Sequence, residues 1–91
     1  MTPEGKISAY FRKKAKECGA FIRKCRWEGR AGAPDWVVFY EGATYYVELK
    51  APGEKPRPLQ LKEHEIMREA GGCLVFVLSS KEEVDFFFNG I

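Results

Sequence analysis

The 91-residue sequence has a single histidine, no C-x-x-C pair among its three cysteines and no long apolar run. One histidine excludes His-rich metal sites and His-dependent active-site designs. The cysteine number and spacing indicate neither a disulfide framework nor a zinc site, so reduced thiols are the simpler interpretation. The longest apolar run, from Cys73 to Leu78, is far too short to span a membrane. No signal-peptide pattern opens the chain, so we expect the protein to remain in the cytoplasm.

The composition is that of a globular protein, with 45% hydrophobic and 31% charged residues. This length predicts one domain over residues 1–91 with a single core. The net charge of +2 hides an asymmetry, because residues 1–30 carry nine Lys or Arg against three Glu. A basic first third suits a protein that holds a polyanion. A solvated, lysine-rich helix face explains the same charges equally well.

The stretch from Pro34 to Lys50 contains two apolar, β-branched and aromatic runs on either side of Glu41-Gly42. This pattern predicts a β-hairpin. A two-residue turn at Glu41-Gly42 pairs Tyr40 with Ala43, and continuing that register places Asp35 directly opposite Glu48. Because side chains alternate between the faces of a strand, Lys50 shares the face of Glu48 and Leu49 points away.

Two carboxylates and one ammonium at the open end of a hairpin suit a divalent metal. Mg²⁺ takes hard oxygen ligands, keeps several waters and is often held by one or two carboxylates plus a phosphate. A metal-bound water could attack phosphorus, with Lys50 steadying that water or the developing negative charge. The alternative is an ordinary surface ion pair at a strand end, which contributes little. Asp35 and the Glu48-Leu49-Lys50 segment in one register favour the metal site.

Before the hairpin, Thr2-Pro3-Glu4 predicts a helix start, and the helix should run to about Cys18 and end at Gly19. Glu4 lies on its apolar stripe, as either a third acid of the site or a helix-dipole partner. Residues 20–27 read as a half-exposed strand near a sheet edge. The Gly29–Ala33 loop follows; Arg30 there is a candidate phosphate contact, with an ordinary turn as the alternative.

After Lys50, prolines and glycine predict a loop over residues 51–58, in which Lys55 and Arg57 are candidate phosphate contacts. Residues 59–70 predict a helix, with Gln60 in its first turn and the lone His64 facing solvent. The inward face expected for this helix consists of Leu59, Glu63, Ile66, Met67 and Ala70. The run 73–78 predicts a strand covered on both faces and parallel to residues 44–49. A last helix follows, opened by Ser79-Ser80.

The order helix, three strands, helix, strand, helix, with Glu4, Pro34-Asp35, Glu48-Leu49-Lys50 and Gln60 at its nodes, resembles the PD-(D/E)xK nuclease superfamily. Within it, the sequence looks most like a minimal virus-type replication-repair nuclease (VRR-NUC) domain. The resemblance implies an α/β, restriction-endonuclease-like core with a mixed sheet flanked by helices.

The same resemblance implies Mg²⁺ or Mn²⁺ bound by Asp35, Glu48 and the Leu49 carbonyl, with Glu4 completing the metal shell. It gives Lys50 the role of orienting the attacking water and Gln60 that of buttressing the lysine. Stand-alone domains of this kind are similar to phage or bacterial homodimers that cut branched DNA such as Holliday junctions, while a larger relative acts on flaps. A non-catalytic nucleic-acid-binding module and a small scaffold whose charges merely pair are the competing hypotheses.

Overall fold

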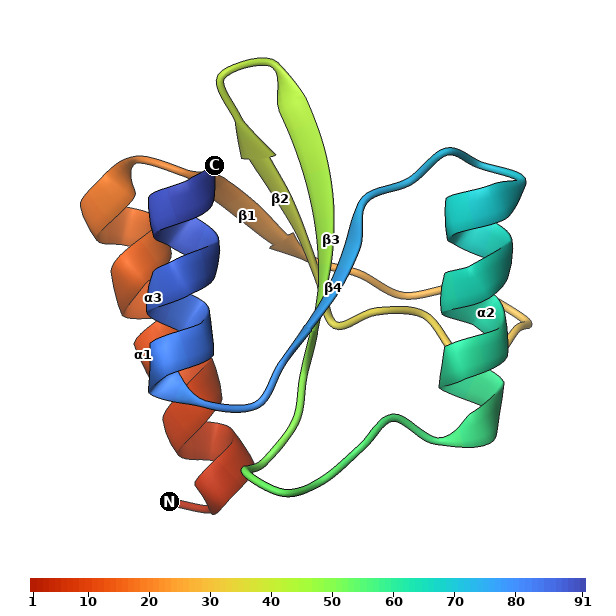
Figure 1. Ribbon diagram of the computed structural model, residues 1–91, viewed down its shortest axis with the longest axis horizontal. Helices are drawn as coiled ribbons and strands as arrows, with labels where there is room; N and C mark the ends of the chain where they lie inside the picture. The colour runs from red at the N-terminus through yellow and green to blue at the C-terminus, as the bar shows by residue number, and fades with distance from the viewer.

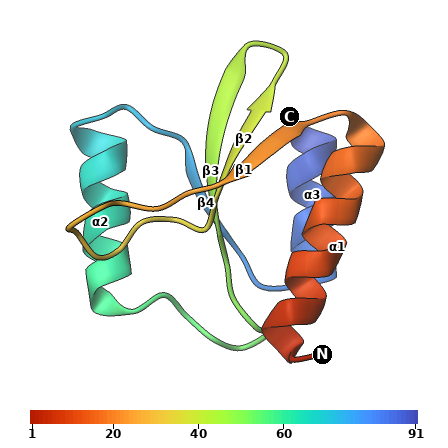
Figure 2. The ribbon, with the colours of Figure 1, turned by 180° about the vertical axis from the view of Figure 1, so that it is seen from behind.

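The computed structural model describes residues 1–91 as a four-stranded sheet between helices. The elements are α1 (Pro3–Cys18), β1 (Phe21–Lys24), β2 (Trp36–Tyr40), β3 (Ala43–Leu49), α2 (Pro58–Glu69), β4 (Val75–Leu78) and α3 (Lys81–Gly90). Helices α1 and α3 lie together against one face of the sheet, and α2 lies alone against the other (Figures 1 and 2). This α-β-β-β-α-β-α order and the mixed sheet confirm the predicted fold class.

The sheet has the order β1-β2-β3-β4, with the first three strands antiparallel and β4 parallel to β3. Tyr40 pairs with Ala43 and Trp36 with Val47, which confirms the predicted hairpin register. The turn residues Glu41 and Gly42 have φ values of 48° and 82°, the positive values that tight two-residue hairpin turns favour. The register therefore fixes which side chains meet at the open end of the hairpin.

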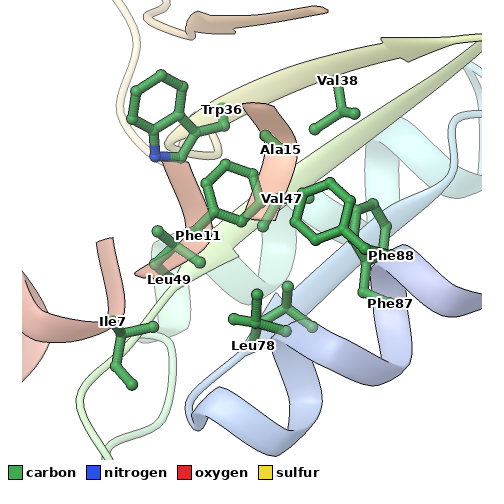
Figure 3. Packing of buried hydrophobic residues seen from close by; sticks show 11 residues of the cluster. Ile7, Phe11, Ala15, Trp36, Val38, Val47, Leu49, Leu78, Phe87 and Phe88 are labelled. Atoms are coloured by element: carbon green, nitrogen blue, oxygen red, sulfur yellow. The ribbon is translucent and has the colours of Figure 1, made fainter. Parts of the chain in front are cut away.

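The main core lies between the sheet and the α1–α3 layer (Figure 3). Helix α1 contributes Ile7, Phe11 and Ala15, the inward positions of its 3.6-residue period. The Phe11 ring is fully buried and lies 5.7 Å from the Trp36 ring and 5.3 Å from the Phe88 ring. Burying a side chain of this size contributes about 2–3 kcal/mol. This packing holds the N-terminus of α1 beside the ends of β2 and β3.

Helix ends follow the sequence signals. Thr2 Oγ1 accepts a hydrogen bond from the Gly5 N–H at 3.0 Å, and Gly19 ends α1 with a φ of 79°. At α3, Ser80 Oγ accepts from the Glu83 N–H at 3.0 Å.

None of the three helices is long and apolar enough to cross a membrane.

Three local expectations are wrong. Strand β1 ends at Lys24 rather than 27, because the chain leaves the sheet there to reach α2. Strand β4 lies at the edge of the sheet and is only partly covered: Val75 and Leu78 are buried on opposite faces, but Phe76 is 36% exposed.

The third concerns α2, which buries Glu63, His64 and Met67 while exposing Leu59 and Ile66. It packs over the polar end of the sheet, where Glu63 pairs with Arg30 of the preceding loop and both ring nitrogens of His64 are buried without a hydrogen-bond partner.

Candidate active site at the open end of the hairpin

The hairpin places Asp35 and Glu48 next to each other, one residue beyond Trp36 and Val47, the last pair of β2 and β3. Asp35 Oδ2 accepts a hydrogen bond from the Leu49 backbone N–H at 2.8 Å. This N–H belongs to the strand end, so the Asp35 carboxylate takes the place of a strand partner there. The bond fixes the carboxylate against the opposite strand and uses one of its two oxygens.

Glu48 is the most unusual group in the molecule because this acidic residue is only 1% exposed. Its Oε2 accepts a hydrogen bond from Gln60 Nε2 at 2.9 Å and lies 3.3 Å from Lys50 Nζ. Its Oε1 is buried without any hydrogen-bond partner. Burial, and then the charge of Asp35, raise the pKa of Glu48 to about 7, although Lys50 opposes the rise. One buried oxygen therefore lacks a partner for its negative charge.

Glu4 faces this cluster from the first turn of α1. It lines a pocket of about 250 Å³ whose walls are Thr2, Glu4, Gly5, Ser8, Lys24, Asp35, Trp36 and Leu49. Its charge contributes, as the smallest of the named causes, to the raised pKa of Glu48. The pocket joins the N-terminus of α1 to the ends of β2 and β3.

Lys24 is a residue of the pocket that the sequence argument missed. It is the register partner of Trp36, and its Nζ lies 4.8 Å from the centroid of the Trp36 ring. The position of Lys24 depends on the pairing of β1 with β2, and the long loop between them leaves that pairing open in the sequence. Its amine adds a second positive group near the carboxylates.

The loop before Asp35 is anchored on α2. Arg30 Nε donates to Glu63 Oε1 at 2.9 Å, and Arg30 Nη2 lies 2.8 Å from the same oxygen. Gly32 has a φ of 98°, and a Cβ there would lie 2.8 Å from the Leu59 carbonyl oxygen. Only glycine fits this close approach without strain. The contact fixes the first turn of α2, from which Gln60 reaches Glu48.

Comparisons with known proteins identify the family of the chain. No family model matches the chain. A solved structure described as a VRR_NUC domain superposes with a TM-score of 0.89 at 38% identity, covering 98% of this chain and 97% of that one. A relative from Acyrthosiphon pisum secondary endosymbiont phage 1, named as a candidate nuclease, p44, is 39% identical over 80 residues, covering 87% of this chain and 85% of the relative. The chain belongs to the VRR-NUC family of nuclease domains. Its substrate class is therefore nucleic acid.

Gln60 of this VRR-NUC domain contacts the acid rather than the lysine. Its Nε2 donates to Glu48 Oε2, and its Oε1 accepts from the Arg57 backbone N–H at 2.9 Å. The amide orientation is thus set at both ends. Gln60 and Lys50 meet at a shared carboxylate oxygen, so any effect of Gln60 on the lysine runs through Glu48.

The three candidate phosphate contacts lie apart from the carboxylate pocket of the VRR-NUC domain. Arg30 is engaged with Glu63, and Lys55 lies exposed in the 51–57 loop. Arg57 lines a different pocket of about 430 Å³, with Ala31, Gly32, Pro58, Leu59 and Gln60. These side chains flank the site from the α2 side, and Lys24 flanks it from β1.

The donor set of the VRR-NUC domain fits a hard cation. No group of three or more His, Cys, Asp or Glu side chains is arranged to hold a metal ion by itself. Asp35 and the unpartnered Oε1 of Glu48 supply two carboxylates, and Leu49, whose N–H bonds to Asp35, lines the same pocket as Asp35. Mg²⁺ commonly binds through this few protein ligands and completes its shell with water and phosphate.

Proposed function

We propose that this protein is a divalent-metal-dependent endonuclease that hydrolyses phosphodiester bonds in structured DNA and works as a homodimer. The observation that carries the proposal is Glu48, a buried carboxylate with one unpartnered oxygen beside Asp35 and Lys50. A bound cation would remove the cost of that unpaired charge. Structural ion pairs rarely leave such an oxygen without a partner.

Asp35, Glu48 and the Leu49 carbonyl would hold Mg²⁺ or Mn²⁺, with Glu4 completing the shell from α1. When bound, such an ion polarises a phosphoryl oxygen and lowers the pKa of a coordinated water. Asp35 is preset for this task because the Leu49 N–H fixes its orientation. Gln60 is a positioning residue that holds Glu48 in place from α2.

Lys50 is the group that would act on the reacting atoms. Its buried amine lies 3.3 Å from Glu48 Oε2, so its position is set before substrate binds. An ammonium at this point can orient the attacking water and stabilise the negative charge that develops on the phosphate. Lys24, on the opposite wall, can hold a phosphate oxygen as a point charge.

The proposed substrate is branched DNA, of the Holliday-junction or flap type, in phage or bacterial replication, recombination or repair. A homodimer is supported by the free edge of β4, where Phe76 is 36% exposed and Leu74, just before the strand, is 51% exposed. Edge strands with apolar side chains are common sites of pairing with a second chain. Two copies would present two carboxylate sites to one branched substrate.

The test is a cleavage assay on junction, flap, duplex and single-stranded DNA with Mg²⁺, Mn²⁺ or a chelator. We expect cleavage that needs the metal and is lost in Lys50→Ala. Binding without cleavage in every metal would instead identify a non-catalytic nucleic-acid-binding module with this fold. Sedimentation of the same samples checks the homodimer, which a purely monomeric active species would rule out.

A further inference from the structure

Two phenylalanines lie side by side on the sheet without a helix covering them. Phe21 on β1 and Phe39 on β2 are register partners, and their rings are 5.6 Å apart at 55°. Phe21 is 50% exposed and Phe39 is 41% exposed. Neighbouring residues on the same strands, Ile22 and Val38, point to the opposite face and join the core. The aromatic pair is therefore not part of the core packing.

An arginine covers part of this pair. The Arg23 guanidinium lies 3.8 Å from the centroid of the Phe21 ring, and its Nη1 donates to the Ile22 carbonyl at 2.7 Å. The stacked guanidinium is charged and uses only part of its hydrogen-bonding capacity. Its remaining N–H groups are therefore available to a ligand at the exposed aromatic surface. We name Phe21, Arg23 and Phe39 the β1 platform.

The β1 platform shares a face of the sheet with Asp35. Strand β1 is an edge strand, and no helix covers it in the view of Figure 2. Lys24, at its far end, lines the pocket that contains Asp35 and Glu4. Because side chains alternate along a strand, Lys24 lies on the opposite face of the sheet from Phe21. Phe39 shares the face of Asp35, four positions and about 13 Å away along the chain. A nucleic-acid strand that leaves the carboxylates at Asp35 can therefore follow this face to the aromatic pair.

The charges around the β1 platform favour nucleic acid as the occupant. From Gly19 to Trp27 the chain has Arg23, Lys24 and Arg26 and no acidic residue. Exposed aromatic rings interleaved with basic side chains match the alternation of bases and phosphates in a single strand. Phe86 offers a contrast: it is 83% exposed on α3, but Glu82, Glu83 and Asp85 precede it.

We propose that the β1 platform binds unpaired nucleotides next to the scissile phosphate. Phe21 and Phe39 stack on bases, and Arg23 holds an adjoining phosphate. This inference rests on the proposed nuclease function and narrows its substrate. It requires a single-stranded segment beside the cut, as in a flap or splayed arm, and disfavours a fully paired four-way junction.

The experiment measures binding without cleavage. Fluorescence anisotropy with a labelled oligo-dT strand in chelator compares the wild type with Phe21→Leu/Phe39→Leu, which keeps apolar area but removes both rings. Loss of stacking on each ring should weaken binding roughly 5- to 100-fold, and the double variant at least about tenfold. Phe21→Trp/Phe39→Trp keeps the rings and should bind within about threefold of the wild type.

Phe86→Leu is the matched control, and it should not change the affinity. Arg23→Gln should weaken binding and flatten its salt dependence, since one phosphate contact is lost. Circular dichroism melts establish that each variant is folded. If the leucine variant unfolds, Arg23→Gln carries the test, and an unchanged affinity and salt dependence in that variant would overturn the inference. Oligo-rU in place of oligo-dT shows whether the β1 platform distinguishes RNA from DNA.

Equal affinity of the wild type and the folded leucine variant would overturn the inference, even if the protein cleaves DNA. Self-association of the wild type that is lost in the Phe21→Leu/Phe39→Leu variant would also overturn it, because the surface would then be a contact between copies of the chain. Conversely, ring-dependent binding in a protein that cleaves no substrate would support the β1 platform while refuting the nuclease proposal. Flaps should be cleaved faster than four-way junctions, and the Phe21→Leu/Phe39→Leu variant should reduce that preference.

Discussion

Replacing Glu48 with glutamine should make the metal-free protein more stable at neutral and alkaline pH. The pKa of Glu48 rises from 4.5 to about 7 in the folded state, mainly through burial and the charge of Asp35. The folded state therefore binds an extra proton between these values. The stability of the wild type should fall as the pH rises through that window, and the loss should persist above about pH 7.

The size of the effect follows from the pKa shift. At about 1.4 kcal/mol per pKa unit, the shift corresponds to about 3 kcal/mol. Glutamine keeps an acceptor for Lys50 and Gln60 and puts a neutral amide where Glu48 Oε1 has no partner. At pH 8 without metal, Glu48→Gln should be more stable by about 2–3 kcal/mol, which raises the Tm by roughly 10–20 °C in a domain of this size.

Thermal melts from pH 4 to 9 in chelator test this directly. The stability difference should be near zero at pH 4 and grow toward pH 7. Added Mg²⁺ should raise the Tm of the wild type, because it binds only the folded state, and should leave Glu48→Gln unchanged. A difference that does not vary with pH, or a less stable variant at pH 8, would refute the idea that Glu48 carries an uncompensated charge.

The other predictions concern groups around the carboxylates. Lys50→Ala should reduce single-turnover cleavage by at least about 100-fold, with circular dichroism showing a folded protein. Lys24→Gln should raise KM roughly tenfold in steady-state cleavage with little change in kcat, since it removes a phosphate contact. The pKa of Glu63 is lowered, first by its hydrogen bond from arginine, so Glu63→Gln should melt earlier at pH 7 and match the wild type once acid protonates that carboxylate. Gly32→Ala should lose about 1–3 kcal/mol in urea unfolding, more than Gly53→Ala, because both have positive φ but only Gly32 lies against the α2 backbone.

The hairpin and helix α1 can be predicted from the sequence because the interactions that form them are between residues close together in the chain. The positive-φ turn at Glu41-Gly42 fixes the hairpin register, and strand alternation then brings Asp35, Glu48 and Lys50 together. Helix α1 follows from its caps and apolar period. These features depend on residues close together in the chain, so propensity and periodicity are sufficient.

The predictions from the sequence were wrong where the surroundings of a side chain depend on an element distant in the chain. His64, expected in solvent, is fully buried, because α2 packs on the polar end of the sheet rather than on an apolar surface. Arg30, expected to contact phosphate, pairs with Glu63 across 33 positions of chain. No local pattern encodes which partner such a charged group meets.

By itself, then, the sequence determined the order of elements, the hairpin and the three groups at its open end. Only the tertiary structure decided that Glu48 lies buried with one oxygen unpartnered, that Lys24 joins the pocket, and that Phe21 and Phe39 form an exposed pair. Desolvation and cross-strand contact depend on everything that surrounds a group, and those surroundings exist only after strands and helices have packed.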